Sequence, residues 1–163
     1  MSQEFASAIM IALAVAFLGL AAWGWVNRRN RFRYLEEHLN GNIPDSHPID
    51  SFDAFHVATT LAEKPLERVP VGPLSFRSKA HCVIYAEGLL IASRGEKTVF
   101  LSAKKGLRAG LATWTIDRVV EPDGLIFVRW GLGPEELDTY LRVVDRDCSE
   151  LIKLIEIRGR RRQ

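Results

Sequence analysis

The residues best suited to chemistry in this sequence are four histidines and two cysteines, and their spacing does not favour a catalytic or metal-binding group. Cys82 and Cys148 lie 66 positions apart without a CxxC motif or a histidine at ligand spacing, which disfavours a disulfide framework and a zinc site. His81 directly precedes Cys82, but neighbouring residues on a strand point to opposite faces. We therefore expect Cys82 to be a small buried residue and not a nucleophile.

Short catalytic motifs are also absent from the sequence. It contains no GxSxG, P-loop, GxGxxG or HExxH pattern, and residues 91–95 end like a nucleophile elbow but lack its first glycine. The carboxylate pairs at 36–37 and 135–136 are expected at a helix end and in a loop, where solvated charge explains them. The sequence thus predicts no catalytic residue, no metal site and no cofactor, and it favours a protein that is not an enzyme.

The first element of the chain with a clear structural role is an uncharged stretch near the N-terminus. Residues 5–26 carry no charge, and as a helix these 22 residues span about 33 Å, close to the roughly 30 Å of a hydrocarbon core. Two tryptophans lie at the end of this stretch, where indole rings favour the headgroup layer, and an arginine block follows at once. We expect six side chains at the membrane interface: Trp23, Trp25, Arg28, Arg29, Arg31 and Arg33.

The order of the charges predicts the topology. A cleaved secretory signal needs positive charge before its apolar run, whereas here Glu4 precedes the run and the arginines follow it. The positive-inside rule keeps that arginine block in the cytoplasm. We expect a single-pass protein of a bacterial plasma membrane, with residues 1–4 outside and the remainder after the span inside. Alanines at 8, 12 and 16 would allow a homo-oligomer through close helix contact, although lipid-facing packing is the simpler explanation.

The rest of the chain divides into a linker and a β-rich body. Residues 27–52 are expected to form a basic juxtamembrane segment and linker, because 40–44 contains Asn, Gly and Pro residues that end helices. From Phe55 onward apolar residues recur with a period of two, which is typical of strands. Seven strands are predicted, at 55–61, 80–86, 88–94, 97–103, 110–120, 124–132 and 136–144. After Val144 the period becomes helical, which predicts a C-terminal amphipathic helix.

This order of elements predicts one transmembrane helix followed by a mainly-β domain at 53–157 and a basic tail at 158–163. Seven antiparallel strands and a terminal helix are similar to the pleckstrin-homology (PH) superfold, a half-open barrel of two packed sheets capped by the helix. The expected core consists of Val57, Val83, Leu90, Val99, Leu101, Trp114, Ile116, Phe127, Leu151, Leu154 and Ile155.

Charge is distributed unevenly along the chain. Residues 34–157 hold 14 basic and 19 acidic residues, a net charge of −5, which argues against a nucleic-acid binder. Two basic clusters could contact lipid or a partner, although a solvated turn and a solubilising tail explain them too. The first is an expected loop in which Leu107 would be exposed, with Lys104, Lys105 and Arg108; the second is the tail, with Arg158, Arg160, Arg161 and Arg162.

The β-rich part of the sequence contains several short motifs: VATT at 57–60, LERV at 66–69, GPLSFR at 72–77, GLLI at 88–91, DGLIFVRW at 123–130 and DTY at 138–140. Together they resemble a family of actinobacterial membrane-anchored proteins with a PH-like domain. The motifs are mostly turn and strand signatures, so the resemblance implies a fold and no catalytic residue. Members are commonly encoded among pyrimidine-biosynthesis genes, which implies a partner such as aspartate carbamoyltransferase or dihydroorotase.

The resulting functional hypothesis is a non-enzymatic, membrane-anchored adaptor that binds a cytoplasmic protein and holds it at the membrane. Two other hypotheses are also consistent with the sequence. One is a domain that senses anionic lipid, and the other is an accessory subunit of a membrane transport or export complex. Against the last, only Ser7 is polar between residues 5 and 26, so the helix cannot line a pathway alone.

The predicted topology can be tested by cysteine labelling. A cysteine replacing Ser2 should react with a membrane-impermeant reagent in intact cells, whereas one replacing Ser46 should not, because the arginine block stays in the cytoplasm. The reverse labelling pattern would place the β-rich domain outside the cell.

Overall fold

The computed structural model describes residues 3–39, 43–112, 125–144 and 146–160. The chain divides into two compact units, residues Met1–Tyr34 and Leu35–Gln163.

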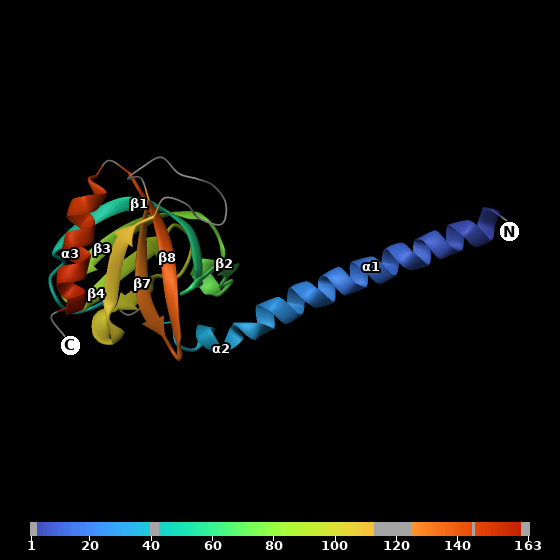
Figure 1. Cartoon of the computed structure of the whole chain (residues 1–163), viewed down its shortest axis with the longest axis horizontal. Coiled ribbons are helices and arrows are strands. Elements are labelled where there is room, and N and C mark those ends of the chain that lie inside the picture. Colours follow the sequence, from blue (N-terminus) through green and yellow to red (C-terminus); the bar gives the residue numbers. More distant parts are fainter. Residues whose placement is uncertain (1–2, 40–42, 113–124, 145, 161–163) are drawn as a thin grey trace. The chain divides into compact units, whose positions relative to one another are not determined.

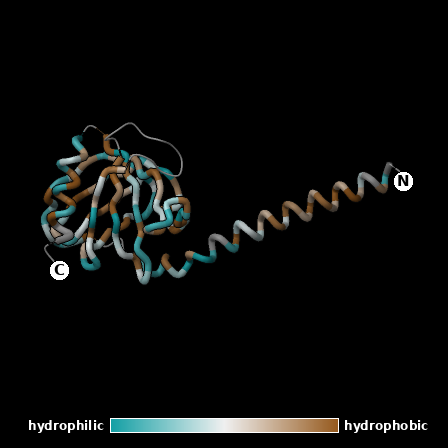
Figure 2. Tube along the Cα trace, viewed as in Figure 1, coloured by the Kyte–Doolittle hydropathy of each residue, from teal (hydrophilic) through white to brown (hydrophobic). Residues whose placement is uncertain are grey.

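The first unit contains the long helix α1, Gln3–Arg31. Within it Ser7–Asn27 is long and apolar enough, by length and composition, to cross a membrane. Figure 2 shows the hydrophobic colouring along most of this helix, and the side chains of Ser7–Asn27 are all exposed. Apolar side chains with no protein around them are what a lipid-facing helix presents. α1 includes the whole predicted span, residues 5–26.

The second unit is built on one antiparallel sheet (Figure 1). Its described residues form eight strands in the order β5-β4-β3-β1-β8-β7-β6, with β2 paired to β1 off this path. Because the path ends at β5 and β6, the sheet is open. The strands are β1 Asp50–Leu61, β2 Lys64–Arg68, β3 Ser78–Tyr85, β4 Gly88–Ser93, β5 Val99–Ser102, β6 Leu107–Leu111, β7 Leu125–Leu132 and β8 Glu135–Val143.

The C-terminal helix α3, Cys148–Arg160, packs against β6 and also contacts β4 and β7. Its buried stripe is Cys148, Leu151 and Ile155, at the spacing of one helix face. An apolar N-terminal helix, an open antiparallel sheet and a terminal helix confirm the predicted fold class.

Three details differ from the sequence-based expectation. The strand β2 was missed, because its sequence KPLER has no apolar alternation; it pairs with β1 after a tight turn at Glu63, whose φ is 65°. The two halves expected as separate sheets are hydrogen-bonded into one, since β1 pairs with β3 along one edge and β8 along the other. The strand expected at 110–120 overlaps β6 only at Gly110 and Leu111, and its residues 113–120 lie outside the described ranges.

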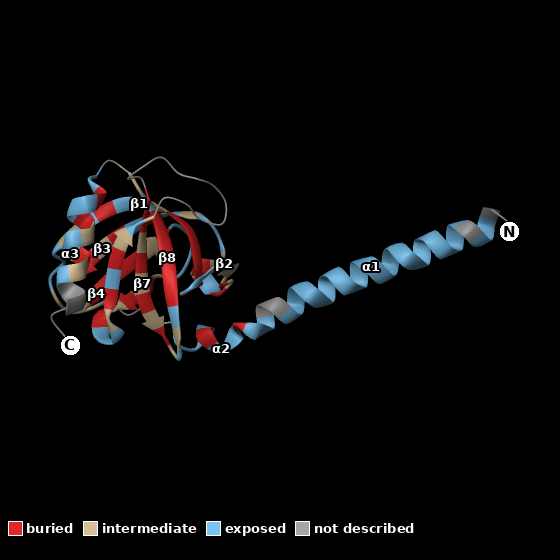
Figure 3. Cartoon of the chain, viewed as in Figure 1, coloured by how far each residue is buried: buried red, intermediate tan, exposed pale blue. Residues whose placement is uncertain are grey.

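The core largely follows the prediction, as the buried interior in Figure 3 shows. Trp114 and Ile116 lie outside the described residues, and Val83, Phe127 and Leu154 are half-buried. Leu154 is displaced from the interior because the buried face of α3 is centred on Leu151 and Ile155, which leaves Leu154 at its margin. The other predicted core residues are buried: Val57, Leu90, Val99, Leu101, Leu151 and Ile155.

The juxtamembrane residues 35–39 are packed onto this domain. Leu35, in the short helix α2 (Arg33–Glu36), is completely buried. A β-carbon at Gly72 would come within 3.1 Å of Leu39 Cδ1, and one at Gly133 within 3.1 Å of the His38 ring. The segment therefore lies against the 3₁₀ turn η1 (Gly72–Ser75) and the β7–β8 turn.

A chain of hydrogen bonds crosses the interior of the domain. His56 Nδ1 lies 3.0 Å from the Phe76 carbonyl oxygen, which can only accept, so Nδ1 carries the proton. His56 Nε2 then accepts from the Thr59 hydroxyl at 3.0 Å. Thr59 accepts from Thr139 at 3.1 Å, and Thr139 accepts from Trp130 Nε1 at 2.9 Å. The four side chains are buried, and every one of these polar groups is satisfied with His56 neutral.

The packing of residue 35 can be tested by truncation to alanine in the fragment 28–163. Leu35→Ala should lower the free energy of unfolding by about 2–5 kcal/mol, as should Leu151→Ala, because both side chains are fully buried. Leu154→Ala, at a half-buried position of α3, is the matched control and should cost less. Urea unfolding followed by circular dichroism measures all three; a Leu35→Ala variant as stable as the unsubstituted fragment would contradict the packing.

The neutral state of His56 predicts a pH dependence. Burial lowers the pKa of His56 below its usual 6.5, and the Arg68 charge lowers it further, whereas the hydrogen bond to Phe76 acts in the opposite direction. Between the folded and unfolded pKa values the unfolded chain binds more protons, so stability should fall as the pH drops below about 6.5. His56→Asn keeps a donor for Phe76 but cannot titrate. Its melting temperature should fall less steeply over that range; equal slopes for the two proteins would disprove the assignment.

Candidate functional site

The predicted membrane-interface residues lie around the end of α1. Trp23 and Trp25 are exposed near the end of the apolar stretch, and Arg31 and Arg33 are exposed beyond it. The side chains of Arg28 and Arg29 lie outside the described part of the chain. Indole rings followed by guanidinium groups along one helix match the order of the headgroup layer and the aqueous phase.

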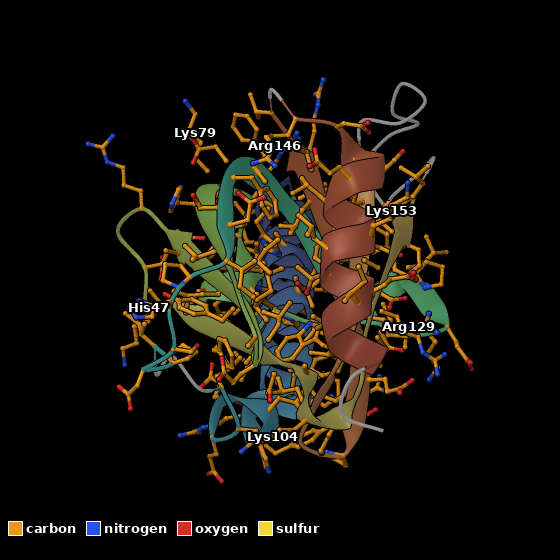
Figure 4. All side chains as sticks on the ribbon, turned by 90° about the vertical axis from the view of Figure 1, so that its left-hand side faces the viewer. His47, Lys79, Lys104, Arg129, Arg146 and Lys153 are labelled. Carbon is orange, nitrogen blue, oxygen red and sulfur yellow. The ribbon has the colours of Figure 1, made fainter. Side chains whose placement is uncertain are left out.

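The residues of the predicted basic loop, 104–108, belong to two different elements of the structure. Lys104 and Lys105 belong to the 3₁₀ turn η2 (Ala103–Lys105), whereas Arg108 lies within β6, where its register partner is Arg129 of β7. The Lys105 side chain lies over Gly131, and its ammonium group donates to the carbonyl oxygen of Gly133. Lys104 is exposed at one end of the domain, where Figure 4 labels it.

The expectation that Leu107 is exposed is wrong. It is only 3% exposed, because it is the first residue of β6 and its side chain faces the interior. The loop therefore offers no apolar side chain at position 107 for insertion into lipid.

A cavity of about 410 Å³ lies beside η2. Its lining includes Lys104, the carboxylate-bearing Glu87, and the apolar Ile43 and Phe100. Glu87 Oε2 accepts a hydrogen bond of 2.6 Å from the Ser46 hydroxyl. Lys105 also lines this cavity, so two ammonium groups and one carboxylate surround it, and the Lys105 ammonium group already donates to the Gly133 carbonyl oxygen.

The predicted basic tail belongs partly to α3. The helix ends at Arg160, and it contacts η2, so the two predicted basic clusters are borne by neighbouring elements. The side chains of Arg158 and Arg160, and residues 161–163, lie outside the description.

The His81–Cys82 pair is arranged as the strand geometry predicts. Cys82 is fully buried, and burial, with a contribution from the Asp53 charge, raises the pKa of its thiol to about 12. His81 is on the exposed face, with Nδ1 2.7 Å from Asp53 Oδ1. Cys82 is therefore a thiol at neutral pH, and its neighbour is directed away from it.

A partly buried ion pair was missed by the sequence analysis. Arg129 Nε and Nη2 donate to the two oxygens of Asp138 at 2.7 and 2.8 Å, and Asp138 is only 6% exposed. This hydrogen bonding raises the pKa of Arg129. Burial raises the pKa of the neighbouring Tyr140, which shares a cavity of about 360 Å³ with the pair. Arg129 and Asp138 are nine residues apart and face each other across the β7–β8 hairpin. No local sequence pattern shows that two such residues form an ion pair.

A second missed feature is a row of side chains on the exposed face of the sheet, which we call the basic row. It consists of Arg142, Phe55, Lys79 and Arg94, contributed by β8, β1, β3 and the residue after β4. Alternation in each strand could have placed each residue on the outer face, but strand order, which brings them together, is not visible in the sequence.

Comparison with known proteins identifies the family. No curated protein matches the chain. A family model described as bacterial PH domain-like matches residues 42–154, which extends from the juxtamembrane segment into α3 and covers well over half of the chain. The match includes all eight strands described above. The matched region contains the open antiparallel sheet and most of its terminal helix, and the chain belongs to the bacterial PH domain-like family.

Proposed function

We propose that this protein is a single-pass membrane adaptor whose PH-like domain binds a cytoplasmic protein and holds it at the membrane. The observation that carries the proposal is the direct succession of a membrane-length apolar helix and a PH-like domain within one chain. A PH-like fold supports a binding or scaffolding role in general, and the helix supplies a membrane anchor.

The connection between anchor and domain is short. From Asn27, where the apolar stretch ends, to Leu35, where the packed domain begins, the chain can extend at most about 26–29 Å. Because Leu35 is fully buried, the residues immediately after it do not lengthen this tether. A partner bound to the domain would be confined close to the bilayer, which raises its effective concentration there.

The charge order supports an orientation with the N-terminus outside and the domain in the cytoplasm, because the arginine block follows the span. The resemblance noted in the sequence suggests an enzyme of pyrimidine synthesis as the bound protein. Direct lipid recognition is the less favoured alternative, because residues 34–157 carry a net charge of −5 and anionic headgroups would repel them.

Deletion of residues 1–27 tests the division of roles. The truncated protein retains Leu35 and the whole PH-like domain, so it should be soluble and cytosolic yet still co-purify with the partner of the full chain. Affinity purification of both forms in mild detergent, followed by mass spectrometry, measures this. A truncated protein that stays on the membrane would favour direct lipid recognition, and one that loses the partner would make α1 part of the interface.

A further inference from the structure

The basic row is assembled by strand register. Phe55 of β1 pairs with Arg142 of β8 on one side and with Lys79 of β3 on the other. Arg94 occupies the next position along, since its backbone N–H donates to the Lys79 carbonyl oxygen. Directly opposed residues place their side chains on the same face of a sheet, so the four form a line about 14 Å long at about 4.8 Å per strand.

The surface beside this line is concave. A cavity of about 580 Å³ is lined by Phe55, Lys79, His81 and Arg94, together with the Asp53 carboxylate and the small, half-buried Ala92. The short side chain of Ala92 between these longer ones leaves room for part of another molecule, and Phe55 supplies an apolar contact within the hollow.

The charge of this surface is opposite to that of the domain as a whole. Within the described ranges, no carboxylate forms an ion pair with Lys79, Arg94 or Arg142. Lys79 Nζ lies 5.7 Å from the centre of the Phe55 ring, and the carboxylate of Asp53 is engaged by His81 at 2.7 Å. Three cations on one face of a net acidic domain form a local positive field that attracts an anionic partner.

We propose that the basic row is the partner-binding surface, and that it binds an acidic polypeptide segment; this rests on the adaptor function proposed above. The cations are spaced in a line across strands and do not converge on one point, which fits successive carboxylates of a peptide better than a single phosphate. Lys79 also lies at the end of the domain opposite Lys104 (Figure 4). The cavity beside Lys104 is lined by His38 and Ile43, so these two residues lie at the Lys104 end of the domain.

The test uses the full chain in uncharged detergent micelles and a fluorescent hexaglutamate peptide as the probe. Fluorescence anisotropy should show binding that weakens with salt, and hexalysine should not bind. The charge reversals Lys79→Glu, Arg94→Glu and Arg142→Glu, made together, should weaken hexaglutamate binding by about tenfold or more. The matched control reverses three exposed cations elsewhere, Lys104→Glu, Arg108→Glu and Lys153→Glu, and should change it by less than about twofold.

Several outcomes would overturn the proposal. Equal losses in the two triple variants would mean non-specific attraction. Binding of soluble dihexanoyl phosphatidylglycerol in place of hexaglutamate, lost only in the row variant, would assign the row to lipid. If the reversed row prevented folding, the milder set Lys79→Gln, Arg94→Gln and Arg142→Gln should still weaken binding, and unchanged binding would contradict the proposal.

Failure of this inference is distinguishable from failure of the adaptor function. A partner that co-purifies equally with the unsubstituted chain and the row variant would leave the adaptor function intact and remove the row from it. Hexaglutamate binding that depends on the row, with no partner co-purified by either form, would retain the row as an acidic-peptide site and remove the adaptor function.

Discussion

The domain depends on β1, which is the strand shared by both halves of the sheet. It pairs with β3 along one edge and β8 along the other, and its register shifts between His56 and Ala58. The hydrogen-bond chain from His56 through Thr59 and Thr139 to Trp130 begins at this irregularity and links β1, β8 and β7. An unmade bond in such a buried chain would cost about 1–3 kcal/mol, so it specifies how the strands must meet. The open face that carries the basic row is a consequence of the same pairing.

Features with a strong local signal could be predicted from the sequence. The uncharged run before Arg28 predicted the membrane-length helix, and alternating apolar residues predicted six of the eight described strands, whereas the strand expected at 110–120 shares only Gly110 and Leu111 with β6. The buried stripe of α3 was visible in its spacing, although Leu154 was assigned to the core when it is only half-buried. These predictions succeed because periodicity reports which side of an element is apolar.

Features that depend on tertiary neighbours could not be predicted. β2 is a polar strand stabilised by its turn and by pairing with β1, so it lacks alternation. Leu35 is a single apolar residue after a basic block, and nothing local shows that the domain buries it. Leu107 was expected in an exposed loop because two lysines precede it, yet it begins a strand and faces inward. The members of the basic row come from four separate segments, and only strand order unites them.

In the proposed adaptor, α1 is the anchor, residues 35–39 shorten the tether, and the outer sheet face contacts the partner. Site-specific photo-cross-linking in intact cells shows whether a cytoplasmic protein is held at that face, with a benzophenone amino acid replacing Asp53, which is exposed beside the row, or Lys64, which is exposed on β2. We expect one membrane-associated protein adduct from position 53 and none from position 64. No protein adduct from either position, or the same adducts from both, would mean that this face of the domain does not hold a cytoplasmic partner at the membrane.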